Sequence, residues 1–176
     1  IAFRRQGKLD LAIADYSRAI EIDPDYAAAY KNRGIVYQHR GIADRRSRQL
    51  DLAIADYKKV IEIDPEDALA FNNLARLLAT VPYSYKRDGK KAAELAEKAV
   101  ALKPEYPPYM DTLAAAYAEI AEFAEAVRTQ EQAIELLKAQ GKDEYVSDYE
   151  SRLKLYQQSK PFRSQPKIST NQQPSG

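Results

Sequence analysis

The sequence predicts an all-α solenoid, in which similar pairs of helices stack side by side, and three observations support this prediction. The first is an internal repeat: LDLAIADYSRAIEIDP at Leu9–Pro24 returns as LDLAIADYKKVIEIDP at Leu50–Pro65 with three substitutions. The second is a composition rich in Ala, Leu, Glu, Lys, Arg and Gln, which are strong helix formers. The third is the spacing of apolar residues at steps of three and four. A repeated helical unit is the sequence signature of a solenoid.

The first copy of the repeat is predicted to be an amphipathic helix that ends at Asp23-Pro24, because the residue before a proline is pushed out of the α region. A second helix is expected from Ala28 to about Gly41, and the second copy forms a third helix that ends at Asp64-Pro65. The apolar residues of the first copy recur on one helical face, and they are Leu9, Ala12, Ile13, Tyr16, Ala19 and Ile20.

Two more pairs of helices and a single last helix are expected downstream. In order, they are Ala68–Thr80, Asp88–Leu102, Pro108–Ile120, Glu122 to about Gln140, and a last helix at 143–158. Proline suits the start of a helix, where its missing N–H costs little, so Pro107 and Pro108 mark one start. Gly141 interrupts the pattern before the last helix. The remaining residues, 159–176, contain three prolines and three basic residues without an acid, and they are predicted to form a flexible basic tail.

The composition excludes several classes of protein. The absence of cysteine excludes disulfides, thiol nucleophiles and cysteine-ligated zinc. A net charge of +1 provides no global field that attracts nucleic acid or an anionic membrane. No apolar run reaches the roughly 20 residues that span a bilayer. The chain starts at Ile1 within a helical pattern, which indicates a fragment, so the absence of a signal peptide is uninformative; a soluble, cytoplasmic protein is favoured.

The residues at the expected helix crossings resemble the tetratricopeptide repeat, a helix pair of about 34 residues, and in particular a bacterial branch of this family. In the second unit these residues are Gly34, Tyr37, Ala53, Val60 and Pro65. The third unit has Ala75, Leu78, Ala92, Ala99 and Pro104, and the fourth has Ala114, Tyr117, Ala126 and Ala133. The resemblance implies a right-handed superhelix with a partial repeat at 1–26, repeats at 27–67, 68–106 and 107–140, and a capping helix at 143–158, all within one domain at 1–158.

Two spacings exceed the length of the family's unit. Pro24 and Pro65 are 41 residues apart, and Pro65 and Pro104 are 39 apart. Because turns between paired helices face solvent and tolerate insertion, the extra residues are expected in the turns around Ile42–Arg48 and Tyr83–Arg87. Arg33 and Ala121 are further departures, since the family favours leucine and glycine at these positions.

The resemblance also implies a binding groove lined by the first helix of each unit. The residues carried over onto this predicted groove are Lys31, Ile35, Gln38, Leu69, Asn72, Asn73, Arg76, Asp111 and Glu119, with small side chains at Ala79, Thr80, Ala115 and Ala118. Amide groups, a basic middle and small apolar patches suit an extended or helical protein segment. The family's carboxylate clamp is not expected, because Lys31 and Asn73 match its pattern whereas Ile35, Pro108 and Thr112 do not.

Charged residues suggest one further interaction surface. Arg40, Arg45, Arg46 and Arg48 form a basic cluster beside one turn, which could bind an acidic partner or a phosphate backbone. No aromatic residue lies within this cluster for base stacking, so nucleic acid is disfavoured as a ligand. Acidic residues of the second helices, such as Asp15 and Asp56, are expected to be solvated.

The function predicted from these features is non-catalytic binding of a protein or peptide, as a scaffold or adaptor. His39 is the single histidine and has no cysteine or second histidine nearby for catalysis or metal binding, so no catalytic residue, metal site or cofactor is expected. Two alternatives stay open. The edge formed by Leu9, Ile13 and Ile20 could support self-association, or the repeats could regulate a larger enzyme or signalling protein.

Overall fold

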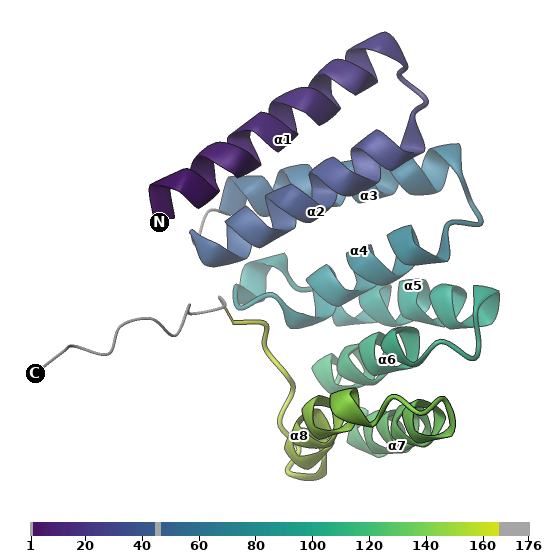
Figure 1. Cartoon of the computed structure of the whole chain (residues 1–176). Helices are drawn as coiled ribbons and strands as arrows, with labels where there is room; N and C mark the ends of the chain where they lie inside the picture. The colour runs from purple at the N-terminus through teal and green to yellow at the C-terminus, as the bar shows by residue number, and fades with distance from the viewer. Residues whose placement is uncertain (1, 45–46, 166–176) are drawn as a thin grey trace, which may run out of the picture.

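The repeated apolar pattern folds as antiparallel helices that stack in one direction (Figure 1). The computed structural model describes residues 2–44 and 47–165. The α-helices in these ranges are α1 (Ala2–Ile22), α2 (Ala27–Ala43), α3 (Ser47–Ile63), α4 (Ala68–Thr80), α5 (Gly89–Leu102), α6 (Pro107–Glu119), α7 (Phe123–Ala139) and α8 (Val146–Gln157), with 3-10 turns η1 (Ser84–Lys86) and η2 (Asp143–Tyr145). These ranges contain no strand, and the predicted all-α solenoid is confirmed.

Three helix pairs form the body of the stack: α2 packs on α3, α4 on α5, and α6 on α7. The first helices of these pairs, α2, α4 and α6, are neighbours in space. At one end α1 packs on α2, and at the other end α8 packs on α7 (Figure 1). The order of the elements therefore matches a half unit, three pairs and a final helix.

Small residues permit the close approach of the paired helices. Ala53, Ala92 and Ala126 are fully buried in the core. A Cβ atom on Gly34 would lie 3.0 Å from a ring carbon of Tyr57, and one on Gly41 would lie 2.5 Å from Leu50. These positions have no room for a larger side chain, which is the physical reason for glycine and alanine at the crossings.

Local signals in the sequence start several helices. At the start of α4, the Asp67 carboxylate accepts a hydrogen bond from the backbone amide of Ala70 at 2.9 Å. At the start of α5, the Asp88 carboxylate accepts one from the backbone amide of Lys91 at 3.0 Å. Such caps satisfy amides that have no partner within the helix. Pro107 occupies the first position of α6.

The two longer units differ from each other in how they accommodate their extra residues. Around the first expected insertion, α2 continues to Ala43 and α3 begins at Ser47, so the additional residues mainly lengthen both helices. At the second, residues 81–88 form a true connection that contains η1. There, Tyr83 and Tyr85 contact each other with ring centroids 5.9 Å apart, and Lys86 forms an ion pair with Asp51 of α3.

The chain reverses direction after α8. Ser159 has a φ of 55°, and the amides of Ser159 and Lys160 donate to the carbonyls of Tyr156 and Leu155, each at 2.9 Å. The following residues run back past α6 towards the end of α4 (Figure 1). Residues 160–165 of the predicted tail thus lie against the repeats, because they meet partners there; residues 166–176 lie outside the described ranges.

Candidate functional site

The residues of the predicted groove lie on three neighbouring helices, α2, α4 and α6. Lys31, Ile35 and Gln38 come from α2, and Leu69, Asn72, Asn73 and Arg76 come from α4. Asp111 and Glu119 come from α6. Their surroundings differ strongly from helix to helix, so each part is described separately.

On α2, the polar groove residues hold the fold together. The Lys31 ammonium donates to the Asp67 carboxylate at 2.5 Å, which ties α2 to the start of α4. Gln38 is buried, and its amide oxygen accepts from the Tyr57 hydroxyl at 2.8 Å. Burial raises the pKa of Tyr57, so this hydroxyl keeps the proton that it donates. Ile35 packs against the core.

On α4, the groove residues include groups that are available to a ligand. Leu69 and Arg76 are exposed. Among the described residues, the Arg76 guanidinium has no carboxylate within ion-pair distance. Asn72 and Asn73 are each 6% exposed, and the side-chain oxygen of Asn72 has no hydrogen-bond partner in the described part of the chain. Arg76 is therefore the groove residue of α4 whose charge is accessible to a ligand.

On α6, both acidic residues already have partners. The Asp111 carboxylate accepts from Gln130 (2.8 Å) and from Arg152 (2.6 Å). Glu119 accepts from the Nε of Arg87 at 2.7 Å and forms a second ion pair with Arg163 at 2.6 Å. Arg152 belongs to α8 and Arg163 to the segment after it. The C-terminal part of the chain therefore neutralises this part of the predicted groove.

Residues 160–165, here called the C-terminal segment, lie against α6 and the end of α4, where part of the groove was predicted. The Ser164 amide donates to the Thr80 carbonyl at 2.8 Å, and the two hydroxyl oxygens are 2.7 Å apart. Phe162 packs against the core, and the Arg152 guanidinium lies 5.6 Å from the centre of its ring. Three groove positions with small side chains are buried: Ala79 at 0%, Ala115 at 4% and Ala118 at 2% exposed.

The sequence analysis missed the C-terminal segment as part of the site, although a signal for it was present. Phe162 and Arg163 stand side by side in a stretch that is otherwise polar and small. An aromatic residue in such a stretch marks the point at which it can bury apolar area.

The predicted basic cluster is only partly described. Arg40 is 8% exposed and donates to the Asp10 carboxylate of α1 at 2.5 Å, so it joins two helices rather than presenting a free charge. Arg48 is exposed, and Arg45 and Arg46 lie outside the described ranges. Of the two described members, one is buried and paired and the other is exposed, so these two do not form a shared free basic surface.

One acidic residue that was expected to be solvated is buried. Asp56 is 4% exposed, and its two carboxylate oxygens accept from the Nε and Nη2 of Arg33 at 2.9 and 2.8 Å. Arg33 also donates to the Ser17 hydroxyl at 3.0 Å. The hydrogen bonds that Arg33 donates to the Asp56 carboxylate raise the pKa of Arg33. The expectation for Asp56 was wrong because a guanidinium from the neighbouring helix compensates its charge.

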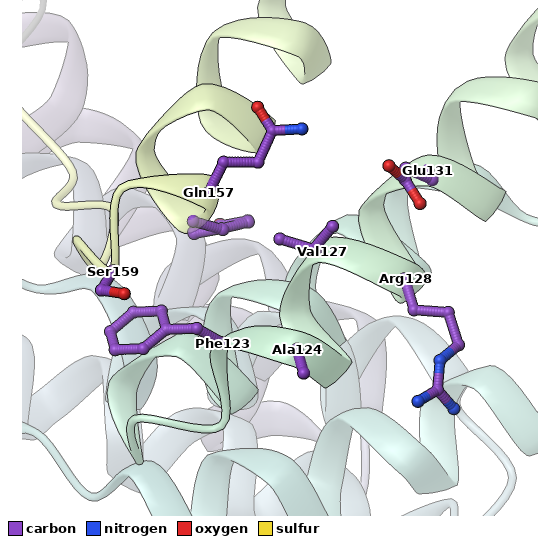
Figure 2. A pocket seen from close by; sticks show the side chains of 8 residues that line it. Phe123, Ala124, Val127, Arg128, Glu131, Gln157 and Ser159 are labelled. Carbon is purple, nitrogen blue, oxygen red and sulfur yellow. The ribbon is translucent and has the colours of Figure 1, made fainter.

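An open pocket lies between α7 and α8, away from the predicted groove (Figure 2). Its polar residues Arg128, Glu131 and Gln157 are exposed, and Figure 2 shows that Arg128 and Gln157 extend in different directions. Polar groups that do not converge give little basis for a small-molecule site. Over the described residues, no group of acidic and histidine side chains could hold a metal ion, and no helix is long and apolar enough to cross a membrane.

Comparisons with known proteins agree with this architecture. A family model described as "TPR repeat" matches residues 2–41 and 43–80. The crystal structure of TTC0263, a thermophilic TPR protein in Thermus thermophilus, aligns with a TM-score of 0.64 at 21% identity, covering 88% of this chain and 77% of that chain.

Two crystal structures of MamA are also similar. They align with TM-scores of 0.60 and 0.62, each at 19% identity. Both alignments cover 88% of this chain, with 86% and 92% of the respective MamA chains. At these identities the likeness concerns the fold. No curated protein matches the sequence.

Proposed function

Because this chain belongs to the tetratricopeptide-repeat family, we propose that it is a non-catalytic scaffold that binds a segment of a partner protein along the predicted groove. The observation that carries the proposal is the contrast between the three helices. The polar groove residues of α2 and α6 are paired within the molecule, whereas α4 presents the exposed Arg76. Recognition is therefore assigned to α4.

The chemistry of α4 favours a partner segment that carries a carboxylate. A guanidinium offers several donors in a fixed plane, which suits bidentate contact with a carboxylate. Apolar contact is available nearby on α4 from Leu69, which is 38% exposed.

Exposed aromatic residues also stand at the starts of the neighbouring helices. Tyr26 directly precedes α2 and is 49% exposed, and Tyr106 directly precedes α6 and is 42% exposed. Tyrosine is enriched at protein interfaces because it combines apolar area with a hydroxyl group. These residues support a protein rather than a small molecule as the ligand.

The proposal is tested by capturing partners from source-cell lysate with wild-type protein, Arg76→Glu and Arg128→Glu. The control residue Arg128 is also an exposed arginine, but it lies on α7 beside Glu125. We expect a partner that binds wild type and Arg128→Glu and is lost by Arg76→Glu, with all three proteins showing the same thermal unfolding. A partner set that is identical for the three proteins would contradict the proposal.

A second candidate function is self-association through α1. Leu9, Ile13 and Ile20 are half-buried where α1 packs on α2 at the end of the stack, while Leu11 and Ile22 are 67% and 74% exposed. Large apolar side chains with this exposure favour contact with another apolar surface. In a repeat protein the end of the stack is such a surface.

A further inference from the structure

We propose that the C-terminal segment, residues 160–165, is an internal ligand of the predicted groove, and that a partner segment with an aromatic residue followed by arginine and serine replaces it. The inference rests on the proposed function, because it takes the groove as the binding surface. It adds a second subsite, between α6 and the end of α4, together with the chemistry of its ligand. In the isolated molecule, the C-terminal segment itself occupies this subsite.

The segment contacts the groove in the way that a bound peptide would. It is extended and lies on the surface: the residues from Pro161 to Ser164 are half-buried, and Lys160 and Gln165 are exposed. One backbone hydrogen bond and one hydroxyl pair join Ser164 to Thr80. In peptide recognition, main-chain hydrogen bonds commonly provide affinity and side-chain contacts provide specificity.

Three successive side chains of the segment define the ligand chemistry. Phe162 packs against the core and lies under the Arg152 guanidinium, which also lies 4.7 Å from the Tyr149 ring centre. Arg163 meets the carboxylate of Glu119, and Ser164 meets Thr80. Aromatic, cationic and hydroxyl groups in succession are therefore matched by an aromatic–arginine platform, a carboxylate and a threonine.

The segment is held by few contacts, so a partner segment that makes the same contacts can compete with it. The described contacts are the bonds of Ser164 with Thr80, the Arg163–Glu119 ion pair at 2.6 Å, and the packing of Phe162 on the core. None of them is covalent, and all three side chains are half-buried rather than enclosed.

When the segment leaves, the carboxylates of α6 keep other hydrogen-bond donors. Glu119 keeps its hydrogen bond from Arg87, and Asp111 keeps those from Gln130 and Arg152. No carboxylate is left without a cation or donor when Arg163 leaves. The left-handed turn at Ser159 follows directly on α8 and gives the segment a natural hinge.

The test uses the full chain and a fluorescein-labelled peptide, QSKPFRSQ, which copies residues 158–165. Binding is measured by fluorescence anisotropy to wild type, to the double variant Phe162→Ala/Arg163→Ala, and to the control Lys160→Ala, whose ammonium contacts Gln158 of the same stretch. A short tether gives an internal ligand an effective concentration of the order of millimolar. We therefore expect the double variant to bind the peptide about tenfold more tightly than wild type or the control.

A third substitution identifies the subsite. Adding Glu119→Gln to the double variant removes the charge that faces the peptide's arginine, and the gain in affinity should be lost. Equal affinity of wild type and double variant, or a gain that survives Glu119→Gln, would overturn the inference. Hydrogen exchange of the Ser164 amide in wild type is an independent readout: it should be at least about tenfold faster than that of buried α4 amides, and equal protection would show a permanent structural contact.

The outcome separates this inference from the proposed function. If the labelled peptide fails to bind while a cellular partner still depends on Arg76, the groove is a binding surface and the internal-ligand inference is wrong. If the peptide binds the double variant but Arg76→Glu alters no partner, recognition is confined to the subsite at Glu119. If the double variant also captures the cellular partner more strongly, the segment acts as a competitor.

Discussion

At the residue scale, most of the ion pairs among the described residues join different elements of the stack. Arg33 contacts residues of α1 and α3 at once, through Ser17 and Asp56. Arg40 ties α2 to α1 through Asp10. Because a buried carboxylate without its cation is costly, such pairs fix which helices are neighbours rather than adding much net stability. This leaves few free charges on the groove, and Arg76 stands out for that reason.

One backbone position at this scale predicts a stabilising substitution. Ala121 has a φ of 64° in the connection between α6 and α7, a conformation that glycine adopts without steric cost. Ala121→Gly should raise the free energy of unfolding by about 1 kcal/mol, measured by chemical denaturation. Ala124→Gly, at an exposed position within α7, is the matched control and should lower it by about 1 kcal/mol. A loss of stability in both variants would show that the turn at Ala121 relaxes in solution.

At the scale of the element, the spacing between paired helices depends on small side chains. Ala92 of α5 is fully buried in the contact with α4, and Gly34 and Gly41 leave little or no room for a Cβ atom. Close packing makes each pair a rigid unit, and this rigidity holds the groove residues of α4 in place. The final element differs, because the left-handed Ser159, two residues after the end of α8, sends the chain back towards α6 and α4.

A single enlargement tests this account of the helix contact. Ala92→Leu adds three carbon atoms to a contact without space for them, so it should lower the free energy of unfolding by about 1–3 kcal/mol. Ala101→Leu introduces the same side chain at an exposed position of the same helix and should change stability by less than about 0.5 kcal/mol. Equal stability of both variants would mean that α4 and α5 do not meet at Ala92.

At the scale of the whole molecule, the two ends of the described stack differ in how much apolar surface they expose. At one end α8 and the C-terminal segment cover the last pair, with Phe162 and Tyr156 in contact with the core. At the other end α1 has exposed Leu11 and Ile22. Because each unit of a repeat protein contacts its neighbours alone, an apolar end is a natural place for a further unit or a second copy.

The self-association candidate predicts a mass that depends on concentration. In light scattering, the wild-type mass should rise with protein concentration, because pairing removes Leu11 and Ile22 from water. Leu11→Glu/Ile22→Glu should remain monomeric over the same range. Ala101→Glu adds a charge to an exposed position on α5 and should behave as wild type. A monomeric wild type at all concentrations would exclude this candidate.

The sequence by itself determined the repeated helices, their order and the small residues at their crossings. These features depend on local periodicity, on prolines such as Pro24 and Pro65, and on steric limits that one unit already contains. Only the tertiary structure decided that Asp56 is buried, that Arg40 pairs with Asp10, and that Arg163 reaches Glu119. Each of these depends on charges far apart in the chain that become neighbours after stacking, and no local pattern specifies which partner a charge will meet. The contrast between the exposed Arg76 of α4 and the paired Asp111 and Glu119 of α6 arises from pairings of this kind.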